Sequence, residues 1–410
     1  MAVIKPLRAI RPKEDVAHLV ASVPYDVVNR EEAADLVNGN DINFLRVTRS
    51  EVELPESTNP YDKSVYEKAR VNFEKLINDG NLIQDSEENL YVYHLTMGDQ
   101  KQAGIAATFS VDDYDNDIIK KHEKTRKVKE DDRTNHIITT EAQTGAVFLT
   151  YKGVDTVNKI VDKTMQTEPI YNFTSNDGII HKLWVMDKTD VKTVVDEIAK
   201  VDYLYIADGH HRAASAARAR AVKKQNNPND NGKEEYNFFL AVLFPAEQLK
   251  ILPYNRVIYD LKGMSESDFL EKIKLNFKVK ISDLPSPKNV REICLYISGK
   301  WYLLTPNENV KKANDVGGNL DVSILQNYLL QPLLGIEDIR TDTNVDFIGG
   351  IRGTQELEKL VNSGKAKIAF SMYPVSIDDL INISDAGETM PPKSTWFEPK
   401  LRDGLVVHTI

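Results

Sequence analysis

The sequence predicts an α/β protein of the mixed α+β kind, with mixed sheets, hairpins and a C-terminal α+β lobe. Helical and extended patterns alternate along the chain, without a repeat, a low-complexity tract or a long linker. Two extended segments, 89–111 and 292–306, each contain a central glycine, Gly98 and Gly299, at which a hairpin would turn. Hairpins pair strands antiparallel, so the pattern argues against a purely parallel sheet.

The other elements follow from the spacing of apolar residues. In 61–80 these residues recur at helical spacing and Gly80 follows as a stop, which predicts a helix. Continuous apolar runs predict strands at 146–151, 178–187, 201–207, 236–244 and 366–374. Further helices are expected around 322–334 and at 354–363.

Three regions are expected along the chain. An N-terminal α+β region covers 1–151, an α/β region packed with it covers 152–281, and the C-terminal lobe covers 282–410. The last boundary is placed at 282–289, where two prolines and a polar run separate two folded patterns. The most polar loop, 223–235, is expected to join a helix to a strand of the same domain.

Composition excludes several classes of protein. The 410 residues carry a formal net charge of −10, which argues against a general nucleic-acid binder. The N-terminus lacks a signal-peptide pattern, and no apolar run approaches the ~18 residues of a membrane span. The one cysteine, Cys294, lies in an apolar run, cannot form an intramolecular disulfide, and is expected in the core. We expect a cytoplasmic protein without a nucleic-acid or membrane partner; homo-oligomer formation stays open.

The segment YLYIADGHHRAASAARAR (203–220) is predicted to be a buried strand that turns directly into an alanine-rich helix. The first N–H groups of such a helix have no partner within the helix, and they carry the positive end of its dipole. A phosphate or another anion is therefore favoured at this turn.

The polar residues of the turn suggest roles around such an anion. Gly209 permits a close backbone approach, and Arg212 could grip phosphate oxygens. Asp208 is placed to act as a base, a metal ligand or a cap, with His210 and His211 beside it. The alternative is a helix capped by Asp208 with two surface histidines. The density of polar groups favours a functional site.

Residues 118–136 form the second dense stretch. Seven Lys or Arg and four Asp or Glu lie between Lys120 and Arg133. Such runs are commonly a solvated helix face. His122 and Glu123 add titratable groups, so a functional site is the alternative; His122, Lys129 and Arg133 are its candidate phosphate ligands.

Two further stretches are candidates. In 22–33, Asn29 is predicted to cap a helix, and an ordinary loop leading into that helix is the favoured interpretation. Tyr25 and Asp26 in the loop are candidate ligand contacts as the alternative. In the proline-rich stretch 390–400, Lys393 could close over a phosphate, or the loop could simply pack. No Walker A loop and no Cys/His zinc cluster is present.

Taken together, AVIKPLRAIRP, PYDVVNREEA, KHEKT…KEDDR, ADGHHRAASA and MPPKSTWFEPK resemble, in this order, the domain-of-unknown-function 1015 family. The resemblance extends over essentially the whole chain and implies kinship of fold. The family has no established activity.

The DGHHR turn also resembles the phosphate-binding turn of the ParB/sulfiredoxin superfamily, most closely that of archaeal ADP-dependent free serine kinases. This resemblance implies a ParB/sulfiredoxin-like strand-turn-helix core in which Gly209 and Arg212 contact nucleotide phosphates. Where sulfiredoxin has a catalytic cysteine this chain has His210, so sulfiredoxin chemistry is not expected. No helix-turn-helix like that of ParB proteins is apparent.

Three functions remain open at this point. The first is phosphoryl transfer to or from a small metabolite such as serine, with ADP or ATP and Mg²⁺ as cofactors. Asp208 or Glu123 would then accept a proton or hold Mg²⁺, and His210 or His211 would polarise the transferring group. The second is a nucleotide- or metabolite-binding regulator without turnover. The third is a metal-dependent hydrolase. Its metal ligands would be Asp208, His210, His211, His122 and Glu123.

Overall fold

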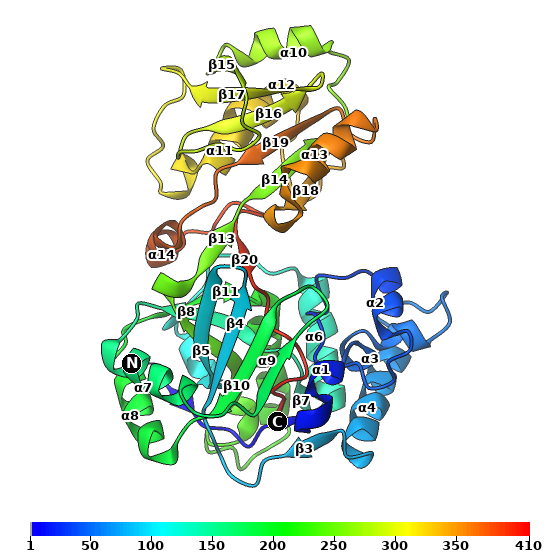
Figure 1. Ribbon diagram of the computed structural model, residues 1–410, viewed down its shortest axis with the longest axis vertical. Coiled ribbons are helices and arrows are strands. Elements are labelled where there is room, and N and C mark those ends of the chain that lie inside the picture. The colour runs from blue at the N-terminus through cyan, green and yellow to red at the C-terminus, as the bar shows by residue number, and fades with distance from the viewer. Residues whose placement is uncertain (1) are drawn as a thin grey trace. The chain divides into compact units, whose positions relative to one another are not determined.

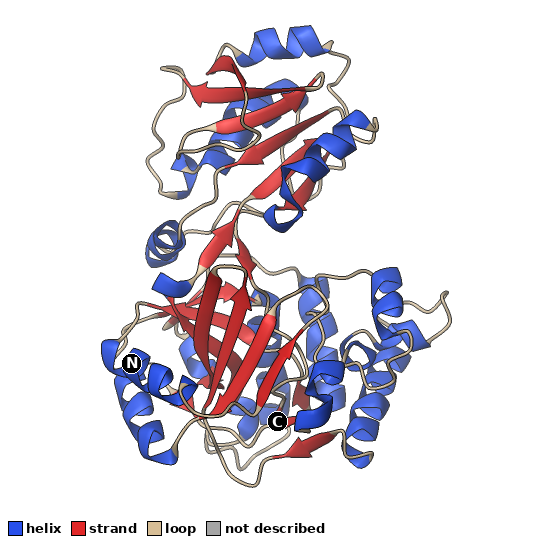
Figure 2. Cartoon of the chain, viewed as in Figure 1, coloured by secondary structure: helices blue, strands red, loops and turns tan. Residues whose placement is uncertain are grey.

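The computed structural model describes residues 2–410. The chain forms two compact units: unit 1 runs up to Leu249 and includes Pro399–Ile410, and unit 2 is Lys250–Glu398. Each unit has its own sheet and helices (Figure 2). The structure is therefore of the mixed α/β class that the sequence predicts.

Unit 1 is built on a nine-stranded mixed sheet (Figure 1). In spatial order its strands are β6 (Ile119–Lys120), β11 (Leu204–Asp208), β8 (Val147–Tyr151), β12 (Phe238–Pro245), β5 (Gln100–Ser110), β4 (Tyr91–Met97), β10 (Ile180–Val185) and β9 (Tyr171–Thr174), and β1 (Ile4–Lys5) also pairs with β5. The pairs β11–β6 and β12–β8 are parallel, and the others are antiparallel. Both the hairpin β4–β5 and the strand that leads into the DGHHR turn agree with the sequence prediction.

The helices of unit 1 include those that carry the polar stretches. They are α1 (Ala17–Val20), α2 (Arg30–Val37), α3 (Leu45–Thr48), α4 (Lys63–Asn78), α5 (Val111–Asp115), α6 (Lys127–Thr140), α7 (Asp155–Met165), α8 (Lys188–Ile198) and α9 (His210–Gln225). The start of α2 is closed by a capping box in which Asn29 and Glu32 bond each other's backbone N–H. This confirms Asn29 as the predicted cap.

The main core of unit 1 lies between one face of the sheet and four helices. Alternate residues of neighbouring strands, Val147 and Leu149 of β8 and Phe239, Ala241 and Leu243 of β12, are buried in one cluster with side chains of α5, α7, α8 and α9. On the α9 side that cluster contains only alanines. Small side chains let α9 lie close to β8 and β12, which fixes the position of its first turn.

Two short ribbons, β2 (Ile10–Pro12) with β3 (Leu82–Gln84) and β7 (Ala142–Gln143) with β21 (His408–Thr409), complete unit 1.

Unit 2 contains a six-stranded antiparallel sheet. Its order is β15 (Phe277–Ser282), β17 (Lys300–Pro306), β16 (Ile293–Ile297), β19 (Ile368–Met372), β14 (Tyr254–Ile258) and β18 (Val345–Gly349), and a separate ribbon pairs β13 (Lys250–Leu252) with β20 (Trp396–Glu398). Its helices are α10 (Glu266–Ile273), α11 (Asp321–Leu325), α12 (Gln331–Leu334), α13 (Gly353–Asn362) and α14 (Ile377–Asp385). Cys294 is fully buried in β16, as predicted for a core residue.

The unit boundaries differ from the three expected regions. The proline-rich seam at 282–289 is a loop between β15 and β16, and both strands belong to one sheet. Expected regions 1–151 and 152–281 share the sheet of unit 1 as far as Leu249. The return of Pro399–Ile410 to unit 1 has no local signal, because it depends on contacts distant in sequence.

Gly404 fixes the path of this returning segment. Its φ is 86°, and a Cβ there would lie 2.6 Å from Cγ of Phe44. We expect Gly404→Ala to cost about 1–3 kcal/mol more unfolding free energy than Gly39→Ala, because of overpacking. Gly39 also has a positive φ, but a Cβ added there would have no neighbouring atom within 4 Å. Equal losses in urea titrations of the two variants would contradict this account.

Candidate functional site

The turn from β11 into α9 has an open helix start. Gly209 occupies the N-cap position with a φ of 91°, a left-handed conformation that favours glycine. No side chain caps the helix, and the Gly209 N–H donates to Oδ1 of Asp208 at 2.9 Å. The next N–H groups, those of His210 and His211, have no partner within the helix and carry the positive end of its dipole.

Lys400, from the returning segment, lies at this turn. Its Nζ donates to Oδ2 of Asp208 at 3.0 Å. Burial opposes ionisation of Asp208, but the charges of Lys400 and Arg212 outweigh it and hold the pKa of this carboxyl well below its usual range. The helix start therefore holds an ionised carboxylate and an ammonium group side by side.

Arg212 points into the protein rather than outward from the first turn of α9. It is 7% exposed and donates to the carbonyl of Ala146. Its Nη2 lies 3.8 Å from carboxylate oxygens of both Asp26 and Asp208. Burial alone would lower the pKa of Arg212, but these carboxylates raise it, so the guanidinium stays charged. Arg212 thus holds the loop with Asp26 against α9.

Two buried histidines meet beside the turn. The rings of His122 and His210 lie edge to face with their centroids 4.3 Å apart. The His122 backbone N–H donates to Nε2 of His210 at 3.4 Å, and Nδ1 of His210 lies 3.8 Å from Oε2 of Glu123. Burial lowers the pKa of His122 to about 4, and burial with His122 lowers that of His210 well below its usual range. Both imidazoles are therefore neutral at pH 7.

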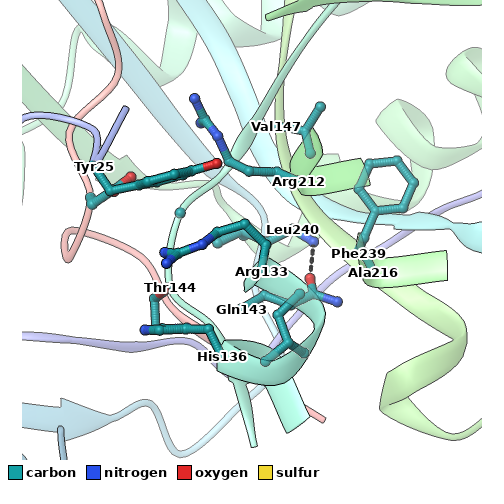
Figure 3. Close-up of a pocket in the computed structure, with 13 residues that line it drawn as sticks. Tyr25, Arg133, His136, Gln143, Thr144, Val147, Arg212, Ala216, Phe239 and Leu240 are labelled. Atoms are coloured by element: carbon teal, nitrogen blue, oxygen red, sulfur yellow. Dashed lines mark hydrogen bonds between the residues drawn. The ribbon is translucent and has the colours of Figure 1, made fainter. Parts of the chain in front are cut away.

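Tyr25 and Arg133 lie together with Arg212 around one small cavity (Figure 3). The Arg133 guanidinium stacks 4.1 Å from the ring centroid of Tyr25 and donates through Nε to Asp132 at 3.0 Å. These residues border a cavity of about 30 Å³, which is also lined by His136 and Arg212.

Asp403 also lines this cavity. The residue is 2% exposed, and neither carboxyl oxygen accepts a hydrogen bond of ordinary geometry from the described residues. Burial raises the pKa of Asp403 to about 7, against the opposing charge of Arg212.

Most of the residues predicted from the sequence come together here. They are Tyr25, Asp26, His122, Glu123, Arg133, Asp208, Gly209, His210, His211 and Arg212. His211 is only half-buried; burial, and then the charge of Arg126, lower its pKa. Segments 22–33, 118–136 and 203–220 therefore converge.

Lys129 lies at the edge of the site: it is half-buried on α6, its Nζ is 5.5 Å from the ring centroid of Tyr61, and its charge contributes to the lowered pKa of His211. The other predicted lysine does not belong to unit 1. Lys393 belongs to unit 2, where its Nζ lies 5.4 Å from the Tyr254 ring and its carbonyl accepts from Arg256. Much of the remaining charge of 118–136 pairs with α9: Arg218 contacts Glu130 and Asp131.

Sequence reasoning missed Lys400 and Asp403. Lys400 is the last residue of the stretch 390–400, in which only Lys393 stands out as a candidate. The letters KLRDG combine two cations with an acid before a glycine, a composition like that of DGHHR. That local signal, together with the turn's need for a cation, could have drawn attention to both residues.

Among residues 2–410, no group of three or more His, Cys, Asp or Glu side chains is arranged to hold a metal ion. None of the helices in the described part of the chain combines the length and apolar character that a membrane span requires.

Comparison with known protein families identifies one family that matches most of the chain. Residues 4–323 match the family described as "Protein of unknown function (DUF1015)". The chain belongs to the DUF1015 family. This confirms the resemblance seen in the sequence; no curated protein matches the chain.

Solved structures give distant likenesses to this DUF1015 protein. A free serine kinase in complex with AMP is 12% identical, with a TM-score of 0.37 over 74% of this chain and 91% of that one. SbnI from Staphylococcus aureus, truncated at its C-terminus, is 11% identical, with a TM-score of 0.39 over 74% and 87%. A conserved hypothetical protein from Pyrococcus furiosus is 12% identical, with a TM-score of 0.36 over 75% and 95%. These values are too low to transfer a ligand or an activity.

Proposed function

We propose that this DUF1015 protein binds a nucleotide or phosphorylated metabolite at the start of α9 and transfers a phosphoryl group to or from a small metabolite. The observation that carries the proposal is the uncapped first turn of a 16-residue helix, with Lys400 beside it. Backbone N–H groups and an ammonium group are the donors that proteins use for phosphate.

The polar residues divide into binding and positioning roles. The N–H groups of His210 and His211 and the Lys400 ammonium would bind phosphate oxygens. Arg212, already held by Asp26 and Asp208, would position those carboxylates rather than grip the ligand itself. The neutral ring of His210 accepts from the His122 N–H at Nε2, and its Nδ1 lies beside Glu123. Its Nδ1–H would donate a hydrogen bond to the ligand only after the ring turned away from Glu123.

Mg²⁺ fits this site only together with phosphate oxygens. Both oxygens of Asp208 already accept, one from Gly209 and the other from Lys400. Asp26, whose side chain is 40% exposed, is the carboxylate that could share such an ion. When bound, Mg²⁺ would neutralise phosphate charge.

Lys400→Met is expected to weaken nucleotide binding about 10–100-fold, because a charge-assisted hydrogen bond to phosphate is lost. Thermal shift with ADP, ATP and pyrophosphate, each with and without Mg²⁺, measures the affinity. Lys223→Met is the matched control, because Lys223 lies in the last turn of the same helix and pairs with Glu141 at 2.9 Å.

The outcomes separate the candidate functions. A shift of several degrees that Lys400→Met removes and Lys223→Met leaves supports the phosphate site. Product formation from the bound nucleotide then supports transfer, whereas binding without product over hours favours a regulator. If none of the ligands shifts the melting temperature, the proposed function is wrong. Lys393→Met in the same panel tests whether unit 2 contributes to binding.

A further inference from the structure

Asp403 presents an unusual carboxyl group. It is almost fully buried, and its two oxygens accept no hydrogen bond of ordinary geometry within the described residues; the backbone N–H of Tyr25 lowers its pKa less than Arg212 or Arg133 does. A Cβ at position 145 would lie 2.7 Å from Oδ1 of Asp403. A glycine at position 145 therefore leaves the room that the Asp403 carboxyl occupies. A buried carboxyl with so few donors is costly to a fold, which suggests a role other than stability.

The cavity beside Asp403 has room for hydrogen-bond partners. Its volume of about 30 Å³ suits one or two water molecules, and its lining includes polar side chains. Arg212 lines the same cavity, and its Nε and Nη2 also lack hydrogen-bond partners within the described residues. Unpartnered donors and acceptors on one small cavity are the setting in which buried water bridges side chains.

Arg212 lies between the cavity and the open start of α9. Its guanidinium lines the cavity beside Asp403 and lies 3.8 Å from Asp208 at the helix start. Asp403 and the helix start therefore share the guanidinium of Arg212 as a neighbour.

We propose that Asp403 is the proton acceptor of the phosphoryl-transfer site and receives the proton of the attacking hydroxyl through water in this cavity. This inference rests on the proposed function. The hydroxyl oxygen forms a bond to phosphorus, and the bond from phosphorus to the leaving nucleoside phosphate breaks with its electron pair on the leaving oxygen. The hydroxyl proton passes to a cavity water, which passes a proton to Asp403.

The alternative acceptor at the helix start is Asp208. Lys400 and Arg212 overcome its burial and hold its pKa far below neutrality, so it cannot keep a proton at pH 7. For Asp403, burial raises the pKa to about 7; the charges of Arg212 and Arg133 oppose this rise and that of Asp26 supports it. A proton acceptor works best when its pKa lies near the operating pH.

Two further titratable groups face the cavity from other elements, Tyr25 from the loop before α2 and His136 from α6. Burial raises the pKa of Tyr25 above its ordinary value and lowers that of His136 to about 4. Both are neutral near pH 7 and therefore do not compete with Asp403 for the proton.

Asp403→Asn tests the inference with ATP and Mg²⁺ as the probe and water as the acceptor hydroxyl. We expect ATP affinity within about threefold of wild type, and phosphate release reduced about 100-fold or more, as for loss of a general base. The wild-type rate should fall on acidification below pH 7, and the residual rate of Asp403→Asn should not. Asp403→Glu, which restores a carboxyl, should recover part of the rate and of the pH dependence.

Asp177→Asn controls for a merely structural role. Asp177 pairs with Arg402, the neighbour of Asp403, so this variant loosens the same segment without touching the cavity. It should keep the wild-type pH profile. If it loses that profile as Asp403→Asn does, the inference is overturned.

An infrared titration without substrate gives an independent readout. The carbonyl band of a protonated carboxylic acid should decrease between pH 6 and pH 8 in wild type and be missing in Asp403→Asn. Absence of this difference overturns the inference, as does a normal rate and pH profile in Asp403→Asn that binds ATP. Failure of wild type to bind ATP, ADP or pyrophosphate instead overturns the proposed function itself.

Discussion

Arg212→Ala is expected to lower the free energy of unfolding by about 3–5 kcal/mol, as for other buried charges left without a partner. Arg212 is the cation between Asp26 and Asp208, and its charge also acts on Asp403. Its removal leaves Asp26, Asp208 and the buried Asp403 without the positive charge that acts on all three. Phosphoryl transfer should fall about 100-fold or more, because the carboxylates that Arg212 positions would no longer be held in place.

Urea denaturation with and without ADP measures the stability effect and the binding, and phosphate release measures the transfer. Arg218→Ala is the matched control: Arg218 lies on the same helix with its side chain 39% exposed and pairs with Asp131, whose side chain is 41% exposed. A pair of this kind contributes about 0–1 kcal/mol. The double variant Arg212→Ala/Asp26→Asn should recover part of the lost stability, since one repelling carboxylate is gone. A loss below about 1 kcal/mol in Arg212→Ala would contradict this role for the guanidinium.

Local patterns predicted much of unit 1. The hairpin β4–β5, the helix α4 and the Asn29 cap each follow from residues close in sequence, so apolar spacing and capping chemistry were sufficient. The strand–turn–helix at Gly209 was predictable for the same reason, because a glycine between an apolar strand and an alanine-rich helix has few other solutions.

The features that the sequence did not predict depend on contacts between residues distant in the chain. The direction of Arg212 depends on the carbonyl of Ala146 and on Asp26, which are distant in the chain. Lys400 and Asp208 are separated by 192 positions, and no spacing rule connects them. The expected boundary at 282–289 failed because prolines mark a loop equally well between domains and between strands of one sheet.

The same contacts predict how stability depends on pH through Asp403. Its pKa is raised by burial from an ordinary value of 3.8 to about 7. Between these two values the folded chain holds a proton that the unfolded chain has lost, so unfolding becomes easier as pH rises. Each pKa unit corresponds to about 1.4 kcal/mol, so this residue alone should cost about 4 kcal/mol above pH 7 relative to pH 4.

Asp403→Asn should therefore be as stable as wild type near pH 4 and about 4 kcal/mol more stable near pH 8. Buried histidines such as His122 and His136 change stability in the opposite direction on the acid side, because burial lowers their pKa values to about 4. Their contribution is common to both proteins and cancels in the difference. Urea titrations of the two proteins at several pH values measure that difference, and a difference independent of pH would contradict the buried, proton-holding state. A rising difference would show that the carboxyl destabilises the fold at neutral pH, which is expected of a group whose use lies in accepting a proton.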